Sequence, residues 1–303
     1  MIILRIVFIT IIMLSIGSVP TNANPSFSKV VVFGDSNVDS GEAQEGSLYN
    51  LSGGILNGPP NVGGRNCNGP VVVEYVADML GVPLVDYGVS GARTGLTNLV
   101  YDFVAIPGVQ YTGVLSQINM FKESLGNKKA DSQALYVYWG GSNDLFGATA
   151  DNLLERVNTA LDNIKTALTI LTDLGARYIL VATRTIRPEY YDENNVNGVV
   201  FNGRLRTLVQ RLNEELKANI QIFEAFDLIT DMTYNPEAYG FVETTDLCIS
   251  IPACVDNPNV SDTYITWDAA HKTTRTHEVM AYELVFQAQN IRKGKGLGVH
   301  SIK

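Results

Sequence analysis

Short apolar segments alternate with segments of helical periodicity along this chain, and this alternation constrains the fold more than any other feature. Five segments rich in β-branched and aromatic residues have the length of strands: 29–33, 83–89, 134–141, 177–183 and 220–226. Five others repeat apolar residues every three to four positions: 69–81, 114–126, 152–175, 201–220 and 273–290. Nearly continuous apolar strands separated by helices predict a parallel sheet covered by helices on both faces, an α/β fold.

The first 23 residues have the pattern of a secretory signal peptide. Arg5 precedes an apolar run over 6–16, and the small residues Thr21 and Ala23 stand just before the expected cleavage point. The run is short for a membrane span, which makes a retained membrane anchor the weaker alternative. We expect residues 1–23 to be removed and residues 24–303 to form a single exported domain, secreted or periplasmic.

Net charge and the cysteine and histidine content bear on three questions: nucleic-acid binding, disulfide bonds and metal sites. The net charge is -9 and no block of Lys and Arg occurs, which argues against a nucleic-acid ligand. In an oxidising compartment Cys248 and Cys254 are candidates for a disulfide that leaves Cys67 unpaired; three unpaired thiols are the alternative. With three histidines and neither a CxxC pair nor an HExxH motif, we expect no metal and no cofactor.

Polar segments follow three of the expected strands, and a fourth precedes the last helix. They are FGDSNVDSG (33–41), SGARTG (90–95), GGSND (140–144) and WDAAHKTT (267–274). In open parallel sheets ligands bind beyond the carboxyl ends of the strands. We therefore expect these four segments to meet at one edge of the sheet.

Together the segments contain the parts of a serine nucleophile site. Ser36 is the candidate nucleophile, His271 the base that activates it, and Asp268 the carboxylate that orients the imidazole. The backbone N–H groups of Ser36 and Gly91 and the side-chain amide of Asn143 are candidate donors to the oxyanion, each worth about 2.7–4 kcal/mol. Taken alone, Gly-Asp-Ser is also an ordinary turn sequence.

Other polar residues near these segments have plainer explanations. Asp35 and Asp39 suit a catalytic pair or a metal site, but carboxylates that hold a turn through backbone amides explain them better. Asp144 is expected to anchor its loop, and His277 to be a packed or surface residue of the last helix.

In their order and separation the four segments resemble the GDSL family of lipases and esterases, the SGNH hydrolases. The resemblance implies a flavodoxin-like three-layer α/β/α sandwich with Ser36, Gly91, Asn143 and His271 in the family's four conserved roles. NGPVVVEYVADMLG and YNPEAYGF also resemble segments of the secreted bacterial phospholipases, lysophospholipases and glycerophospholipid acyltransferases. The family usually has proline after the histidine; here Lys272 stands there, and its charge predicts an altered pH optimum through repulsion of a protonated His271.

The expected function is that of a serine esterase which forms an acyl-enzyme on Ser36 and acts on phospholipids or lysophospholipids. Its partners would be the acyl ester and, transiently, a membrane surface. The loop 41–70, the apolar stretch 98–114 and the segment CISIPAC (248–254) are candidates for the walls of an acyl groove, CISIPAC also for a lid, or for covering loops without a substrate role. The alternatives are a carbohydrate acetyl esterase with the same residues and a non-catalytic glycan- or lipid-binding protein.

Overall fold

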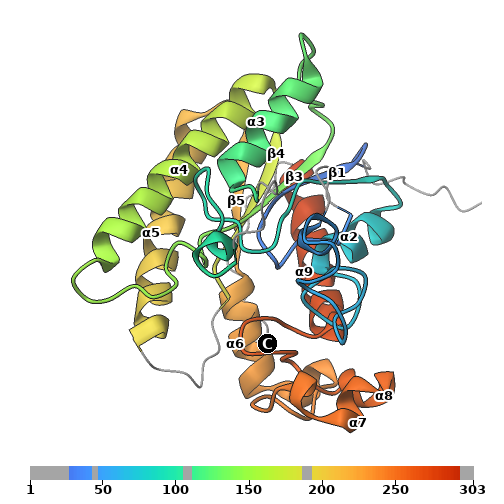
Figure 1. Cartoon of the computed structure of the whole chain (residues 1–303). Coiled ribbons are helices and arrows are strands. Elements are labelled where there is room, and N and C mark those ends of the chain that lie inside the picture. Colours follow the sequence, from blue (N-terminus) through green and yellow to red (C-terminus); the bar gives the residue numbers. More distant parts are fainter. Residues whose placement is uncertain (1–26, 43–46, 105–110, 186–192, 294–303) are drawn as a thin grey trace, which may run out of the picture.

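The computed structural model describes residues 27–42, 47–104, 111–185 and 193–293 (Figure 1). Five parallel strands form one sheet in the order β2-β1-β3-β4-β5. The strands are β1 Val30–Gly34, β2 Leu84–Asp86, β3 Leu135–Trp139, β4 Tyr178–Ala182 and β5 Asn219–Phe223. This strand order is that of flavodoxin-like sheets. The expected signal peptide lies outside the described residues.

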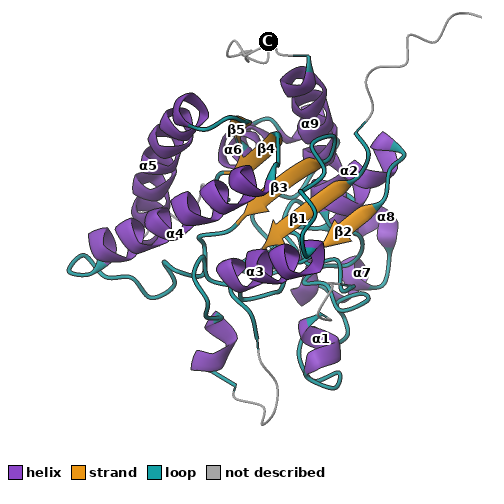
Figure 2. Ribbon diagram, turned by 90° about the horizontal axis from the view of Figure 1, so that it is seen from above, coloured by secondary structure: helices purple, strands orange, loops and turns teal. Residues whose placement is uncertain are grey.

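Helices cover both faces of the sheet, as the apolar strands predicted (Figure 2). Along β1, Val30 and Val32 join one buried cluster, whereas Val31 and Phe33 join the other. The first cluster lies under α2 Val72–Leu80, α6 Ala225–Tyr234 and α9 Thr274–Arg292. The second lies under α3 Val114–Leu125, α4 Leu153–Leu174 and α5 Glu193–Glu215. The molecule is thus a three-layer α/β/α sandwich.

Several boundaries differ from the sequence prediction: α2 begins at Val72 and not at 69, β2 ends at Asp86 and not at 89, and α5 ends at Glu215 and not at 220. Helix α5 begins at Glu193, eight residues before the predicted start. The predicted strand 220–226 is wrong at its end, because β5 stops at Phe223 and Ala225 begins α6. Ala225, Leu228, Ile229 and Met232 are buried along one side of that helix, so packing against the sheet selects helix over strand.

Short elements fill the connections: α1 Leu48–Leu51, η1 Leu99–Asp102, η2 Pro236–Tyr239, η3 Cys248–Ser250, α7 Pro252–Val255 and α8 Pro258–Ser261.

Cys248 and Cys254 are joined by a disulfide with a Cα–Cα distance of 5.3 Å. Cys67 is a free, buried thiol. Its burial raises the pKa of that thiol to about 12. Within the described ranges, no helix is long and apolar enough to cross a membrane.

The last helix packs against the first long one, so distant parts of the sequence lie together (Figure 1). At the start of α9, Thr274 N–H donates to Asn68 Oδ1 at 2.9 Å, and Thr274 Oγ1 donates to Pro70 O at 2.9 Å. These contacts tie the segment that precedes α9, which contains His271, to the N-terminal half of the molecule.

Candidate active site

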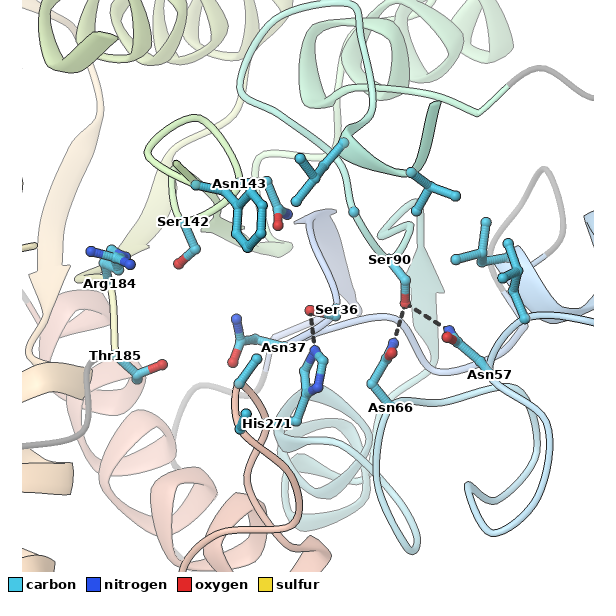
Figure 3. Close-up of a pocket in the computed structure, with 18 of the residues that line it drawn as sticks. Ser36, Asn37, Asn57, Asn66, Ser90, Ser142, Asn143, Arg184, Thr185 and His271 are labelled. Carbon is cyan, nitrogen blue, oxygen red and sulfur yellow. Dashed lines mark hydrogen bonds between the residues drawn. The ribbon is translucent and has the colours of Figure 1, made fainter. Parts of the chain in front are cut away.

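The carboxyl ends of β1, β2, β3 and β4 open onto one cleft of about 730 Å³. Ser36 follows β1, Gly91 follows β2 and Asn143 follows β3, while His271 comes from the segment before α9; all four line the cleft (Figure 3). The four polar segments therefore meet at one edge of the sheet, as the strand-end rule indicated.

Asp268, His271 and Ser36 form a continuous chain of hydrogen bonds. His271 Nδ1 lies 2.9 and 2.8 Å from the two carboxylate oxygens of Asp268, and His271 Nε2 lies 2.9 Å from Ser36 Oγ. A carboxylate only accepts hydrogen bonds, so Nδ1 carries the proton of the neutral ring and Nε2 accepts the Ser36 hydroxyl proton. This tautomer is the one that a serine nucleophile needs.

A tight turn fixes the Asp268 carboxylate. The backbone N–H groups of Ala270 and His271 each donate to Asp268 Oδ1 at 2.8 Å, and Trp267 N–H donates to His271 O at 2.9 Å. Burial raises the pKa of Asp268, but the hydrogen bond and charge of His271 and these backbone donors outweigh it, so that the pKa is lowered overall. Asp268 therefore stays ionised beside the imidazole at neutral pH.

The turn that carries Ser36 requires a glycine before it. A Cβ on Gly34 would lie 2.2 Å from Trp139 O on the neighbouring strand. The buried side chain of Gln117 on α3 pairs with both backbone groups of Gly34, accepting from its N–H at 2.8 Å and donating to its C=O at 2.9 Å. The end of β1 is therefore held from both sides.

Asp35 holds the same turn, as the sequence analysis expected. Its Oδ1 accepts from Asn37 N–H at 3.0 Å and from Asn37 Nδ2 at 2.8 Å. The carboxyl group is fully buried, and this burial raises its pKa to about 6. Among the described residues no group of His, Cys, Asp and Glu suits a metal ion.

Gly91 has a backbone conformation that other residues rarely adopt. Its φ is +81°, and a Cβ there would lie 2.4 Å from Asn98 Oδ1. Within the described part of the chain, the N–H groups of Ser36 and Gly91 have no hydrogen-bond acceptor. Asn143, which lines the cleft, donates from Nδ2 to Ala92 O at 2.9 Å, and this bond uses one of its two amide N–H groups. The three predicted oxyanion donors thus line one cleft.

A buried network of hydrogen bonds fixes Ser90, the residue that precedes Gly91. Asp39 Oδ2 accepts from Ser90 N–H at 2.8 Å and from Ser90 Oγ at 2.7 Å, while Asp39 Oδ1 accepts from Gly41 N–H at 3.0 Å. Ser90 Oγ in turn accepts from the side-chain amides of Asn57, at 3.1 Å, and of Asn66. Asp39 thus holds the loop that carries Gly91, in addition to its own turn.

Asp144 anchors its loop, as predicted. Its carboxylate accepts from Thr94 N–H at 3.0 Å and from Thr94 Oγ1 at 2.6 Å, which joins the Asn143 loop to the Gly91 loop.

His277 is a buried packing residue of α9, and burial lowers its pKa to about 3. Lys272 is buried as well. Its effect on the pH dependence of His271 stays a prediction.

The walls of the cleft come from the two loops that the sequence singled out. The segment 41–70 supplies Leu48, Leu56, Asn57 and Asn66, and the segment 98–114 supplies Leu99 and Val100. The disulfide segment 248–254 contributes no lining residue. The cleft therefore gives no support to CISIPAC as a groove wall, and its role as a lid is untested.

Sequence reasoning missed the lining residues Phe146 and Gly147, and it missed two more at the end of another strand, Arg184 and Thr185. They directly follow β4, so the strand-end rule applied to that strand identifies them. It also missed Asn57 and Asn66, which lie in a loop without periodicity, and Gln117, whose helical position does not reveal its pairing with Gly34.

Comparison with known proteins agrees with this geometry. Residues 30–284 match the family described as GDSL-like Lipase/Acylhydrolase. The thermolabile hemolysin of Vibrio parahaemolyticus is 26% identical over 293 residues, which cover 87% of this chain but 64% of the hemolysin, less than two thirds of its length. A GDSL esterase/lipase of Arabidopsis thaliana is 25% identical over 334 residues, which cover 88% of this chain and 91% of the plant protein.

A solved structure shares the fold. The acetylxylan esterase Axe2 from Geobacillus stearothermophilus superposes with a TM-score of 0.51 at 15% sequence identity, covering 87% of this chain and 94% of that one. The family match spans the whole sheet and the four segments that meet at its edge. This chain belongs to the GDSL-like lipase/acylhydrolase family and is a carboxylic ester hydrolase.

Proposed function

We propose that the protein is an exported serine hydrolase that cleaves lipid esters through an acyl-enzyme on Ser36. The observation that carries the proposal is the unbroken hydrogen-bond chain from Asp268 through His271 to Ser36, which ends in a cleft with a partly apolar wall. Such a chain converts a weakly nucleophilic hydroxyl into one that attacks an ester at neutral pH.

In the acylation step, Ser36 Oγ attacks the carbonyl carbon of the ester and its proton passes to His271 Nε2. The carbonyl oxygen becomes an oxyanion, which accepts hydrogen bonds from Ser36 N–H, Gly91 N–H and Asn143 Nδ2. Asp268 stabilises the imidazolium that has formed. When the tetrahedral intermediate collapses, the bond to the alcohol oxygen breaks and His271 returns the proton to that oxygen.

In the deacylation step, His271 takes a proton from a water molecule whose oxygen attacks the acyl-enzyme. Collapse of this second intermediate releases the carboxylic acid, and the proton returns to Ser36 Oγ. An alcohol that occupies the place of the water would receive the acyl group instead, so the same residues support acyl transfer.

Apolar lining favours a lipid acyl chain. The larger apolar side chains that line the cleft are Leu48, Leu56, Leu99, Val100 and Phe146. Phe146 is 56% exposed at the rim, and its ring lies edge-on to that of Phe103, 5.7 Å away and 66% exposed. Large exposed aromatic side chains beside a cleft suit transient contact with a lipid surface. Phospholipids and lysophospholipids are the proposed substrates.

A carbohydrate acetyl ester is the second candidate. Asn57, Asn66 and Ser90 form a polar group in the same cleft, suited to hydroxyl groups of a sugar. The structural relative Axe2 is named as an acetylxylan esterase. A glycan- or lipid-binding protein without catalysis is the candidate of another class, and the complete set of Ser36, Asp268 and His271 argues against it.

The deciding experiment compares hydrolysis of p-nitrophenyl esters from acetate to palmitate by the wild type and by Ser36→Ala. Loss of all activity in the variant, with a preference for medium or long chains in the wild type, supports the lipid esterase. An acetate-only profile indicates the carbohydrate esterase. Equal rates in the two proteins, or an absence of labelling by an organophosphonate probe, would overturn Ser36 as nucleophile.

Export is tested by N-terminal sequencing of protein from the culture medium, which should begin at Asn24.

A further inference from the structure

One part of the cleft is not used by the proposed mechanism. Arg184 and Thr185 follow β4, Ser142 precedes Asn143, and all three line the cleft. Figure 3 shows them on one side of the Ser36–His271 pair, with Ser90, Asn57 and Asn66 on the other. Two polar regions therefore flank the nucleophile, and only this one contains a charged side chain.

The backbone of Arg184 is held in place by a buried amide. Asn202 on α5 has no exposed surface; its Oδ1 accepts from Arg184 N–H at 2.8 Å and its Nδ2 donates to Arg184 O at 3.0 Å. Both the carbonyl and the amino group of this buried side chain thus hold the backbone of one residue at the edge of the cleft. Arg184 therefore projects from a fixed point of the scaffold beside the strand end.

Arg184 gives the described lining of the cleft a positive charge. Among the described residues that line the cleft, Arg184 is the one with a permanent charge, and His271 is the other ionisable group. The chain as a whole carries a net charge of -9. A guanidinium has a planar set of N–H donors that matches the oxygens of a phosphate or a carboxylate.

We propose that Arg184, with the hydroxyl groups of Ser142 and Thr185, forms a subsite for a phosphate or carboxylate group of the ester substrate. This inference rests on the proposed ester hydrolysis and adds that the enzyme selects anionic esters over neutral esters of the same length. Arg184 acts on specificity and takes no part in proton transfer.

Two matched pairs of substrates test the subsite and distinguish the source of the anion. The first pair, 1-oleoyl lysophosphatidate and 1-oleoylglycerol, differs by a phosphate on the alcohol side of the ester. The second pair, the mono-p-nitrophenyl ester of adipic acid and p-nitrophenyl hexanoate, differs by a carboxylate on the acyl side. We expect Arg184→Gln to lower kcat/KM for the charged member of one pair by about 10-fold or more, with the neutral member unchanged within about twofold.

Two further variants sharpen the result. Arg184→Lys keeps the charge but loses the planar donors, and should retain part of the preference. Arg204→Gln is the matched control, because Arg204 is exposed on α5 and bonds Asn158 Oδ1 at 2.7 Å outside the cleft. Equal effects of Arg184→Gln on both members of each pair, or no effect, would overturn the subsite while leaving the ester hydrolase intact.

A binding measurement keeps the inference testable without catalysis. Hexyl phosphate should bind Ser36→Ala in a calorimetric titration, and the double variant Ser36→Ala, Arg184→Gln should bind it at least about 10-fold more weakly. Equal binding to both variants overturns the subsite. Failure of the wild type to hydrolyse any of the four esters would overturn the proposed function instead, and the titration would still decide the subsite.

Discussion

Asp39 and Ser90 are joined by two hydrogen bonds to a single carboxylate oxygen: Ser90 N–H and Ser90 Oγ both donate to Asp39 Oδ2, at 2.8 and 2.7 Å. Ser90 directly precedes Gly91, whose N–H is a proposed oxyanion donor. Both residues are almost fully buried. The position of that donor therefore depends on a side chain that never touches substrate.

Replacing Asp39 by Asn should lower kcat about 10-fold with little change in KM, less than the loss caused by deleting an oxyanion donor outright. The reason is that Asn has one acceptor oxygen, whereas Asp39 accepts from Ser90 and also from Gly41. Steady-state kinetics on p-nitrophenyl butyrate measure the effect. Asp131→Asn is the control, because Asp131 holds Gln133 at the opposite end of the sheet. A rise in KM alone would contradict the positioning role.

Replacing Gly91 by Ala tests the oxyanion site directly. The new Cβ would meet Asn98 Oδ1 at 2.4 Å and the residue would keep a φ of +81°, so we expect kcat to fall about 100-fold together with a loss of stability. Gly81→Ala is a matched control: its φ is +66° but nothing lies within 4 Å of the new Cβ. This control should lose stability in thermal unfolding and keep its kcat.

Replacing Asp268 by Asn should lower kcat by about 10³–10⁴-fold, because the amide no longer fixes the Nδ1–H tautomer or stabilises the imidazolium. The exposed Asp256, in the same C-terminal region, gives the control Asp256→Asn. Titration of the active site with an organophosphonate should still label Asp268→Asn, only more slowly. Full activity in Asp268→Asn would show that the carboxylate has no catalytic role.

The buried Asp35 should make stability depend on pH. Burial raises its pKa in the folded protein from 3.8 to about 6, so its protonated form favours the folded state. Its contribution to stability is complete below pH 3.8 and is lost as the pH rises through about 6, at about 1.4 kcal/mol per pH unit between these values. Asp35→Asn keeps the acceptor for Asn37 and should remove this slope.

Urea unfolding at pH 4.5 and pH 5.5 measures that slope. The free energy of unfolding of the wild type should fall more steeply over this interval than that of Asp35→Asn. Asp78→Asn, on the exposed side of α2, should follow the wild type. Identical slopes in all three proteins would show that Asp35 keeps an ordinary pKa in the folded state.

The exposed aromatic pair at the cleft rim should matter for lipid surfaces. Replacing both Phe103 and Phe146 by Ser should reduce hydrolysis of phospholipid vesicles several-fold while hydrolysis of soluble p-nitrophenyl butyrate changes little, because only the vesicle requires docking. Phe286→Ser, at an exposed position of α9, is the control. A parallel loss on both substrates would assign Phe146 to the cleft wall alone.

The strands, the long helices and the residues of the polar segments were predictable from sequence because each depends on local patterns. Periodicity marks a buried face, and polar residues after apolar strands mark the active edge of a parallel sheet. Ser36, Gly91, Asn143, Asp268 and His271 were all identified in this way, and they lie together in the structure.

What escaped prediction depends on contacts between distant residues. Gln117 pairs with Gly34 across 83 positions of sequence, and Asn66 reaches Ser90 across 24. Neither side chain belongs to a periodic or motif pattern, so nothing local marks it. Helix α6 was missed because its apolar residues directly continue those of β5, and the sheet that it covers decides where the strand stops.

The packing of α9 against α2 determines when the active site can form during synthesis of the chain. Ser36 and His271 are 235 positions apart, and the segment with His271 is tied down through Asn68 and Pro70. A nascent chain that has emerged only as far as α8 holds the nucleophile and its turn but no base. In the proposed mechanism, Ser36 therefore becomes reactive toward esters only after the segment with His271 has docked, so an incomplete chain carries a serine without its activating base.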